Sequence, residues 1–270
     1  MTGAQLRDPW PVVLVHGTRT SHSQWDLQLP ALRAAGHPVH TPDLPGHGER
    51  RDEAFVLDDA LTTILDAVTR AGTDSGLPVH LVGSSLGGML AIHAAARLAT
   101  GRADGAASDG TTNALGSLTA CGAALQPSPL LARLYAGLIG LAEAVPGMGD
   151  GTAPLFVALL GADGARAYHR GGRADVSVVA PAFAALAGLD LAADLARIPV
   201  PVTFLHGRFD QMRWDEQAFV RAAPQARLEL LPYGTHMVNL NAPHRFNADL
   251  LRVLARAQRE HGRATGSGGS

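Results

Sequence analysis

The chain has 270 residues, of which 46% are hydrophobic, enough for one globular core with a small inserted subdomain, and this composition excludes intrinsic disorder. A formal net charge of −2, from 22 basic and 24 acidic residues, provides no long-range field for gathering nucleic acid or an anionic membrane surface. Every basic residue is arginine, so chemistry through a lysine Schiff base, including the usual attachment of pyridoxal phosphate, is excluded.

Cysteine content and apolar segments indicate the compartment. The single cysteine, Cys121, rules out an internal disulfide or a cysteine cluster for zinc, and we expect it to be a small buried hydrophobe. No apolar stretch follows a basic N-terminus as in a signal peptide. The longest apolar stretch, residues 130–145, contains Arg133 and Glu143 and is shorter than the roughly 20 residues that cross a bilayer. We therefore expect a soluble, cytoplasmic protein with no integral membrane association.

Short runs of β-branched and aliphatic residues recur along the chain, each followed by a longer segment rich in alanine and leucine. They predict strands at residues 12–15, 38–41, 79–82, 116–120, 202–206 and 226–231. The intervening segments predict helices at residues 23–35, 57–71, 85–99, 213–222 and 243–258. The alternation is typical of an α/β protein whose mostly parallel sheet has helices on both faces and binds ligands at the carboxyl ends of its strands.

Residues 126–199 interrupt this alternation, because alanine, glycine and leucine dominate, charges are few and no convincing strand is present. We expect a core made of residues 1–126 and 199–262, with a helical insertion at residues 127–198. Residues 100–113 are predicted to form an exposed loop, and residues 263–270 a flexible tail. Neither is expected to contribute to chemistry.

The strongest motif is GSSLG at residues 83–87, between a predicted strand and a predicted helix. A G-x-S-x-G turn in this position forces its central serine, Ser85, into a strained conformation with the hydroxyl projecting. The new helix directs the Leu86 backbone N–H and a positive dipole at a reacting carbonyl. The alternative, a glycine–serine turn without catalytic meaning, is disfavoured by the strand before the motif and the helix after it.

Further motifs agree with this one: HGT at residues 16–18, PDLPGHG at 42–48, FD at 209–210 and GTH at 234–236. Together they resemble the α/β-hydrolase superfamily from residue 12 to about residue 256, most weakly across the insertion. The resemblance implies the α/β-hydrolase fold with a helical cap, and a catalytic order of serine, aspartate and histidine along the chain. Few residues precede Val12, so we expect the family's first antiparallel strands to be missing or abbreviated.

Under this resemblance His236 is the general base, and Asp210 fixes its tautomer and stabilises the imidazolium. Asp210 closes the loop immediately after a predicted buried strand, whereas the alternatives Asp215 and Glu216 begin a predicted amphipathic helix. The chain has twelve histidines, and most of the others lie within predicted strands or helices. His236 lies in the loop after the last strand, where the superfamily places its base.

The oxyanion hole is expected to use the backbone N–H groups of Leu86 and Thr18, with Arg19 and Thr20 as alternatives to Thr18. His16 is expected to brace its loop through hydrogen bonds. The turn at residues 42–48 is mainly architectural in the superfamily, so no chemistry is assigned to its side chains.

The cap is predicted to cover the serine, with Leu134, Leu138, Phe156 and Met237 lining the substrate pocket. A cap with so little charge argues against a highly anionic substrate and favours a small to medium hydrophobic ester, lactone or thioester, cleaved through an acyl-enzyme on Ser85. The alternative is that the cap leucines only pack the insertion onto the core.

Other functions share the same residues. The superfamily supports carbon–carbon bond hydrolysis, lyase and perhydrolase chemistry with almost the same triad, and it also contains non-catalytic ligand-binding receptors. No metal-ligand cluster and no nucleotide-binding glycine motif is evident, so we expect no metal and no cofactor. The expected partner is a hydrophobic small molecule, and the oligomeric state is not predicted.

Overall fold

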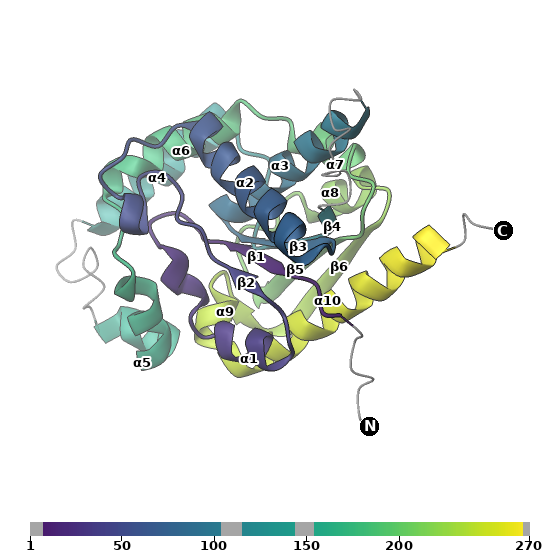
Figure 1. Cartoon of the computed structure of the whole chain (residues 1–270). Coiled ribbons are helices and arrows are strands. Elements are labelled where there is room, and N and C mark those ends of the chain that lie inside the picture. The colour runs from purple at the N-terminus through teal and green to yellow at the C-terminus, as the bar shows by residue number, and fades with distance from the viewer. Residues whose placement is uncertain (1–7, 104–114, 144–153, 267–270) are drawn as a thin grey trace.

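The computed structural model describes residues 8–103, 115–143 and 154–266. Its centre is a parallel sheet in the order β2-β1-β3-β4-β5-β6 (Figure 1). The strands are β1 (Val12–Val15), β2 (Val39–His40), β3 (Val79–Ser84), β4 (Leu115–Cys121), β5 (Val202–Phe209) and β6 (Ala226–Thr235). The predicted strands and their parallel arrangement are confirmed.

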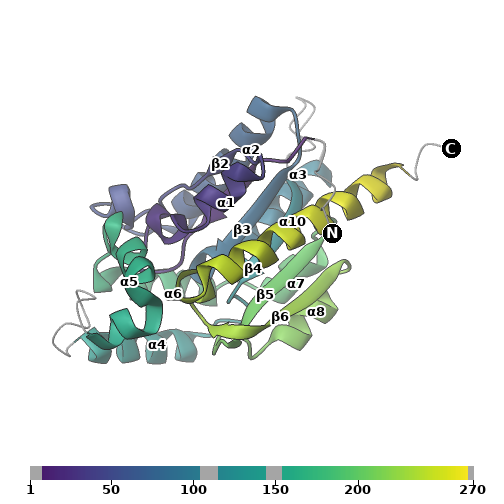
Figure 2. The same cartoon turned by 90° about the horizontal axis from the view of Figure 1, so that it is seen from below.

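Alternate strand residues enter two separate hydrophobic cores, one on each face of the sheet. In β1, Val13 and Val15 belong to one core, whereas Val12 and Leu14 belong to the other. The first core is closed by α2 (Leu57–Ser75), α3 (Leu86–Ala103) and α8 (Glu216–Ala222). The second is closed by α1 (Leu29–Ala34) and α10 (Pro243–Gly266), which lie together on one face in Figure 2. Because both faces are covered, the central strands β1, β3 and β4 are buried along their whole length.

Between β4 and β5 the chain forms a helical insertion. It comprises α4 (Pro129–Glu143), α5 (Pro154–Arg170), η4 (Val176–Val178), α6 (Val179–Ala187) and α7 (Leu191–Ala196). Helices α4 and α6 pack together, and α5 packs against η1 (His22–Trp25) and α9 (Val238–Asn241). Helix α7 instead packs on α3 and α8. Helices α4 and α5 lie at one end of the sheet, away from the last turns of α10 (Figure 2).

The single helix expected at residues 23–35 is instead η1 followed by α1, and this part of the prediction is wrong. The cause is Pro30 in the first turn of α1, because a proline cannot donate to a preceding turn but fits the start of a new helix. A second short 3₁₀ turn, η2 (Gly48–Arg50), ends the glycine-rich segment after β2.

The predicted C-terminal ends of two helices also differ from the structure. Helix α3 continues to Ala103 and α10 to Gly266, so the first residues of both the expected loop and the expected tail are helical. The rest of these two segments, residues 104–113 and 267–270, lies outside the described residues. Within the described ranges, no helix combines the length and apolar character required to span a bilayer.

Candidate active site

Ser85 occupies the turn between β3 and α3 at the carboxyl end of the sheet. Its backbone φ is 53°, in the left-handed region that residues other than glycine rarely adopt. The Ser85 N–H donates to the carbonyl oxygen of Cys121 at the end of β4, over 2.9 Å. A Cβ on Gly83 would lie 2.3 Å from the carbonyl oxygen of Gly87, so only glycine permits this close crossing. The turn therefore holds Ser85 in a strained conformation at the wall of a cavity.

Asp210 and His236 follow the neighbouring strands β5 and β6, which brings them together at the same sheet edge. The Nδ1 atom of His236 lies 2.9 Å from Oδ1 of Asp210, and this oxygen also accepts the Met212 backbone N–H at 2.8 Å. Burial opposes ionisation of Asp210, but the hydrogen bonds from His236 and Met212 outweigh it and hold the pKa of this carboxyl below its usual range.

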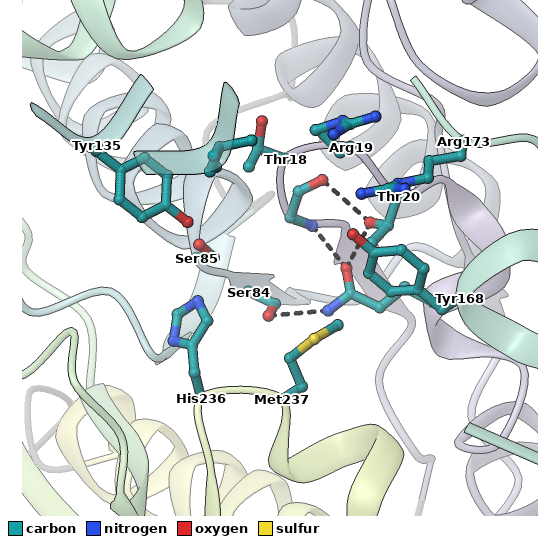
Figure 3. A pocket seen from close by; sticks show the side chains of 13 residues that line it. Thr18, Arg19, Thr20, Ser84, Ser85, Tyr135, Tyr168, Arg173, His236 and Met237 are labelled. Atoms are coloured by element: carbon teal, nitrogen blue, oxygen red, sulfur yellow. Dashed lines mark hydrogen bonds between the residues drawn. The ribbon is translucent and has the colours of Figure 1, made fainter. Parts of the chain in front are cut away.

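The Asp210–His236 pair leaves one imidazole nitrogen for chemistry. An ionised carboxylate can only accept hydrogen bonds, so Nδ1 of His236 carries the proton and Nε2 is the proton acceptor. Figure 3 shows the imidazole pointing toward Ser85 across one corner of the cavity. The structure thus brings the three sequence-predicted catalytic side chains into one site.

Two backbone segments are candidates for an oxyanion hole: the loop after β1, whose Thr18 lines the cavity, and the first turn of α3, whose Leu86 directly follows Ser85 but is not among the lining residues. Leu86 is the first residue of α3, where a backbone N–H has no carbonyl one turn earlier to bond. The Oγ1 atom of Thr18 is buried and has no hydrogen-bond partner among the described residues. These segments are suited to bind an oxyanion or another polar group of a ligand.

Gln24 is a buried residue that the sequence analysis did not single out. Its Oε1 accepts the Gly17 N–H at 2.7 Å, and its Nε2 donates to Oγ of Ser84 at 3.0 Å (Figure 3). Its own carbonyl oxygen accepts Nδ2 of Asn239, on α9. One side chain and its backbone therefore connect the loop after β1, the serine turn and the segment after β6. An isolated glutamine has no motif that would have revealed this role.

Hydrogen bonds among polar residues support the loop after β1. Asp43 accepts hydrogen bonds from the backbone N–H and Nδ1 of His22, over 2.6 and 2.8 Å. Nε2 of His16 accepts the Leu44 N–H at 3.0 Å, and burial lowers the pKa of His16. Burial also lowers the pKa of His47, to about 3. His16 and His47 are neutral structural elements, as expected for His16 and for this turn.

The cavity that contains Ser85 has a volume of about 190 Å³. Its wall combines the site residues with side chains from α4, from α5 and from the segment after α5 (Figure 3). The lining residues are Gly17, Thr18, Arg19, Thr20, Gln24, Ser84, Ser85, Tyr135, Ile139, Tyr168, Arg173, His236 and Met237. Met237 was expected in the pocket, and it lies there.

Leu134 and Leu138 do not line this cavity, contrary to the prediction. Their side chains are 60% and 65% exposed, and they border a separate apolar cavity of about 210 Å³. Helical geometry explains the difference, because successive residues point about 100° apart. The next position after each leucine, Tyr135 and Ile139, is the one that faces Ser85. Leucine spacing identified an apolar stripe on α4 but not which side of the helix covers the site.

Phe156 lies in α5, and its side chain is outside the described part of the structure. Met237 contacts the small hydrophobic cluster formed between α5 and α9. Among the side chains that the structure describes, no group of three His, Cys, Asp or Glu residues is placed to hold a metal ion.

The fold agrees with comparisons to known proteins. A model of the alpha/beta hydrolase family matches residues 12–249, so the chain belongs to that family. Among curated relatives, a pimeloyl-[acyl-carrier protein] methyl ester esterase from Neisseria meningitidis is 38% identical over 86 residues. This match spans 32% of the present chain and only 31% of the relative's length.

Solved structures match over nearly the whole chain. An esterase from Thermogutta terrifontis is 21% identical, with a TM-score of 0.67, and the match covers 92% of this chain and 90% of that one. The enol-lactonase from Burkholderia xenovorans is also 21% identical, with a TM-score of 0.64 and coverage of 93% and 92%. At this identity the likeness shows the α/β-hydrolase fold, with its six-stranded parallel sheet and helices on both faces.

Proposed function

We propose that the protein is a serine hydrolase that cleaves a small to medium carboxylic ester, lactone or thioester with an apolar portion, through an acyl-enzyme on Ser85. The observation that carries the proposal is the strained backbone of Ser85, at φ 53°, beside a histidine held by a buried carboxylate. Such strain at a strand-to-helix turn has a cost, and it persists where a projecting hydroxyl is needed.

In the proposed mechanism, Oγ of Ser85 attacks the substrate carbonyl carbon while Nε2 of His236 takes the hydroxyl proton. Asp210 keeps the proton of His236 on Nδ1 and stabilises the imidazolium. The N–H groups of Leu86 and Thr18 donate to the oxyanion of the tetrahedral intermediate. Collapse releases the alcohol or thiol, which takes the proton from His236. Water, deprotonated by the same nitrogen, then attacks the acyl group and restores the Ser85 hydroxyl.

The volume of the cavity favours a small substrate. Its volume of about 190 Å³ is below the roughly 300–1,000 Å³ of sites for drug-sized ligands. Tyr135, Ile139 and Met237 supply apolar walls next to the nucleophile. We propose that the insertion, residues 127–198, acts as the cap of this site and that residues 1–126 and 199–262 form the core. The curated esterase relative supports an ester bond as the target.

A fluorophosphonate probe and an activated aryl ester test the proposal. The probe should label Ser85, and p-nitrophenyl butyrate should give a burst of chromophore equal to the enzyme concentration. Ser85→Ala should abolish both signals while the fold is retained. Ser84→Ala, which removes only the acceptor of the Gln24 hydrogen bond, should cause a much smaller loss. Labelling of a protein that lacks Ser85, or the absence of any labelling in the wild type, would refute the proposed function.

A further inference from the structure

One fixed positive charge faces the catalytic cavity from the insertion. Arg173, in the segment between α5 and η4, lines the cavity, and in Figure 3 it lies across from Ser85 and His236. Among the described residues that line the cavity, none is an aspartate or glutamate. The cap sequence as a whole has few charges, so its composition did not indicate that one cation lies at the site itself.

The Arg173 guanidinium is oriented by an aromatic ring. Its Cζ lies 5.6 Å from the centroid of Tyr168, and this tyrosine, on α5, is itself buried. A guanidinium that stacks on a ring loses little further freedom when it binds an anion, because the ring already restricts it. Tyr168 lines the same cavity, so ring and cation form one surface of the pocket.

A hydrogen bond connects the segment that contains Arg173 to the loop after β1. Nε of Arg19, in the loop after β1, donates to the carbonyl oxygen of Ala174 at 3.1 Å. Arg19 is buried and follows Thr18, the proposed oxyanion donor. This bond joins the residue after Arg173 to the residue after Thr18, so the position of the cation is set relative to the reacting carbonyl.

The chemistry of a guanidinium indicates the ligand. Arginine has five N–H donors in a planar fork, so it can hold a carboxylate with two parallel bonds while it keeps other contacts. Ile139, Met237 and the ring of Tyr135 provide apolar surface in the same cavity as Ser85 and Arg173. A matching ligand has a reactive carbonyl at one end, a short apolar portion and an anionic group at the other end.

We propose that Arg173 binds a carboxylate of the substrate, so that the preferred substrates are small esters or lactones that also carry a free carboxylate. This inference rests on the proposed function and narrows its substrate class to esters and lactones that carry a negative charge, which differs from the sequence-based expectation of a hydrophobic substrate without high anionic charge. The carboxylate can belong to the acyl part or to the leaving alcohol, and both sources present the same group to Arg173.

Matched esters test the inference. For the acyl side, monoethyl glutarate is compared with diethyl glutarate, and for the alcohol side, 3-acetoxypropionate is compared with its methyl ester. The wild type should prefer at least one of the charged esters, in kcat/KM, over its neutral partner by about 10-fold or more. Arg173→Gln should lower kcat/KM for that charged ester by about 10- to 100-fold and for the neutral ester by less than about 3-fold. Arg173→Lys should restore part of the loss, because it keeps the charge but not the fork.

A matched control removes the same charge elsewhere on the insertion. Arg166 lies on α5, is 71% exposed and pairs with Asp163, and it is not among the cavity residues. Arg166→Gln should leave the preference for the charged ester unchanged. An equal effect of both substitutions would show that net charge, and not a contact in the pocket, determines the preference, and would overturn the inference. A wild type that prefers both neutral esters would also overturn it.

Binding without turnover separates this inference from the proposed function. Glutarate should bind to Ser85→Ala in calorimetry, and the double variant Ser85→Ala/Arg173→Gln should bind it at least about 10-fold more weakly. If the fluorophosphonate labels Ser85 but glutarate binding does not depend on Arg173, only the carboxylate assignment fails. If glutarate binding depends on Arg173 but no serine is labelled, the site binds carboxylates and the hydrolase proposal fails.

Discussion

Gly122 offers a sharp test of the catalytic geometry, because it bears no functional group. It follows β4 with φ of 57°, next to the pair formed by Asp210 and His236. A Cβ added here would lie 2.8 Å from Oδ2 of Asp210 and 2.8 Å from Nδ1 of His236. The substitution Gly122→Ala therefore places a methyl group against the hydrogen bond that fixes the tautomer of the proposed base.

The magnitude follows from these distances. Ordinary contacts begin at 3.4 Å, so the imidazole or the carboxylate must move by about 0.6 Å. Misplacing catalytic groups by about 1 Å can reduce the rate about 100-fold, and complete loss of the aspartate's role about 10,000-fold. We expect kcat/KM to fall between about 10- and 100-fold. The left-handed backbone costs alanine about 1–2 kcal/mol, which corresponds to a decrease in Tm of roughly 2–8 °C in a domain of this size.

Gly76→Ala is the matched control. Gly76 has a φ of 66°, and nothing lies within 4 Å of its added Cβ, so this variant has the same backbone strain without the clash. Steady-state hydrolysis of p-nitrophenyl butyrate and thermal unfolding are measured for both. Gly122→Ala should lose at least as much stability as Gly76→Ala, because the clash adds to the same backbone strain, and only Gly122→Ala should lose activity. If Gly122→Ala is folded and keeps kcat/KM within about 3-fold of the wild type, the assignment of Asp210 and His236 is refuted.

Three further predictions use the same assays. Asp210→Asn should lower kcat by up to about four orders of magnitude. Asp215→Asn should have little effect, because the Asp215 carboxylate accepts a backbone N–H outside the cavity. Equal losses in the two variants would leave the catalytic acid unassigned. Ile139→Asp should raise KM for a butyrate ester about 10-fold or more, because the Ile139 side chain faces the cavity. Leu138→Asp should not change KM, because Leu138 is exposed. A larger increase in KM for Leu138→Asp than for Ile139→Asp would refute the orientation of α4. The free energy of unfolding should fall from pH 7 toward pH 5, because burial lowers the pKa of several histidines in the folded state and the unfolded chain then binds protons that the folded chain does not. Each such group contributes up to about 1.4 kcal/mol per pH unit, and a Tm that is constant over this range would contradict the reasoning. The groups are His47, with a pKa of about 3, His80, about 3, and His206, about 4.

The sequence by itself determined the sheet and the order of the candidate catalytic residues. Buried strands leave short runs of β-branched and aliphatic residues, amphipathic helices leave a pattern of 3.6 residues, and the turn at Ser85 needs small residues at set positions. Asp210 and His236 were identified because the resemblance to the α/β-hydrolase superfamily places the acid and the base in loops after late strands, and parallel strands bring their carboxyl ends to one edge of the sheet. These inferences depend on neighbours in the chain, which a single sequence displays.

Only the tertiary structure decided which residues face the cavity. The leucines of α4 recur with helical spacing, but spacing does not fix the rotation of a helix about its axis, and the structure turns Tyr135 and Ile139 toward Ser85. Gln24 and Gly122 contact loops more than 80 residues away in the chain, so no local pattern marks them. The same reason applies to Arg173: composition averages charge over a segment, whereas a binding site depends on where one charge lies once distant segments have packed together.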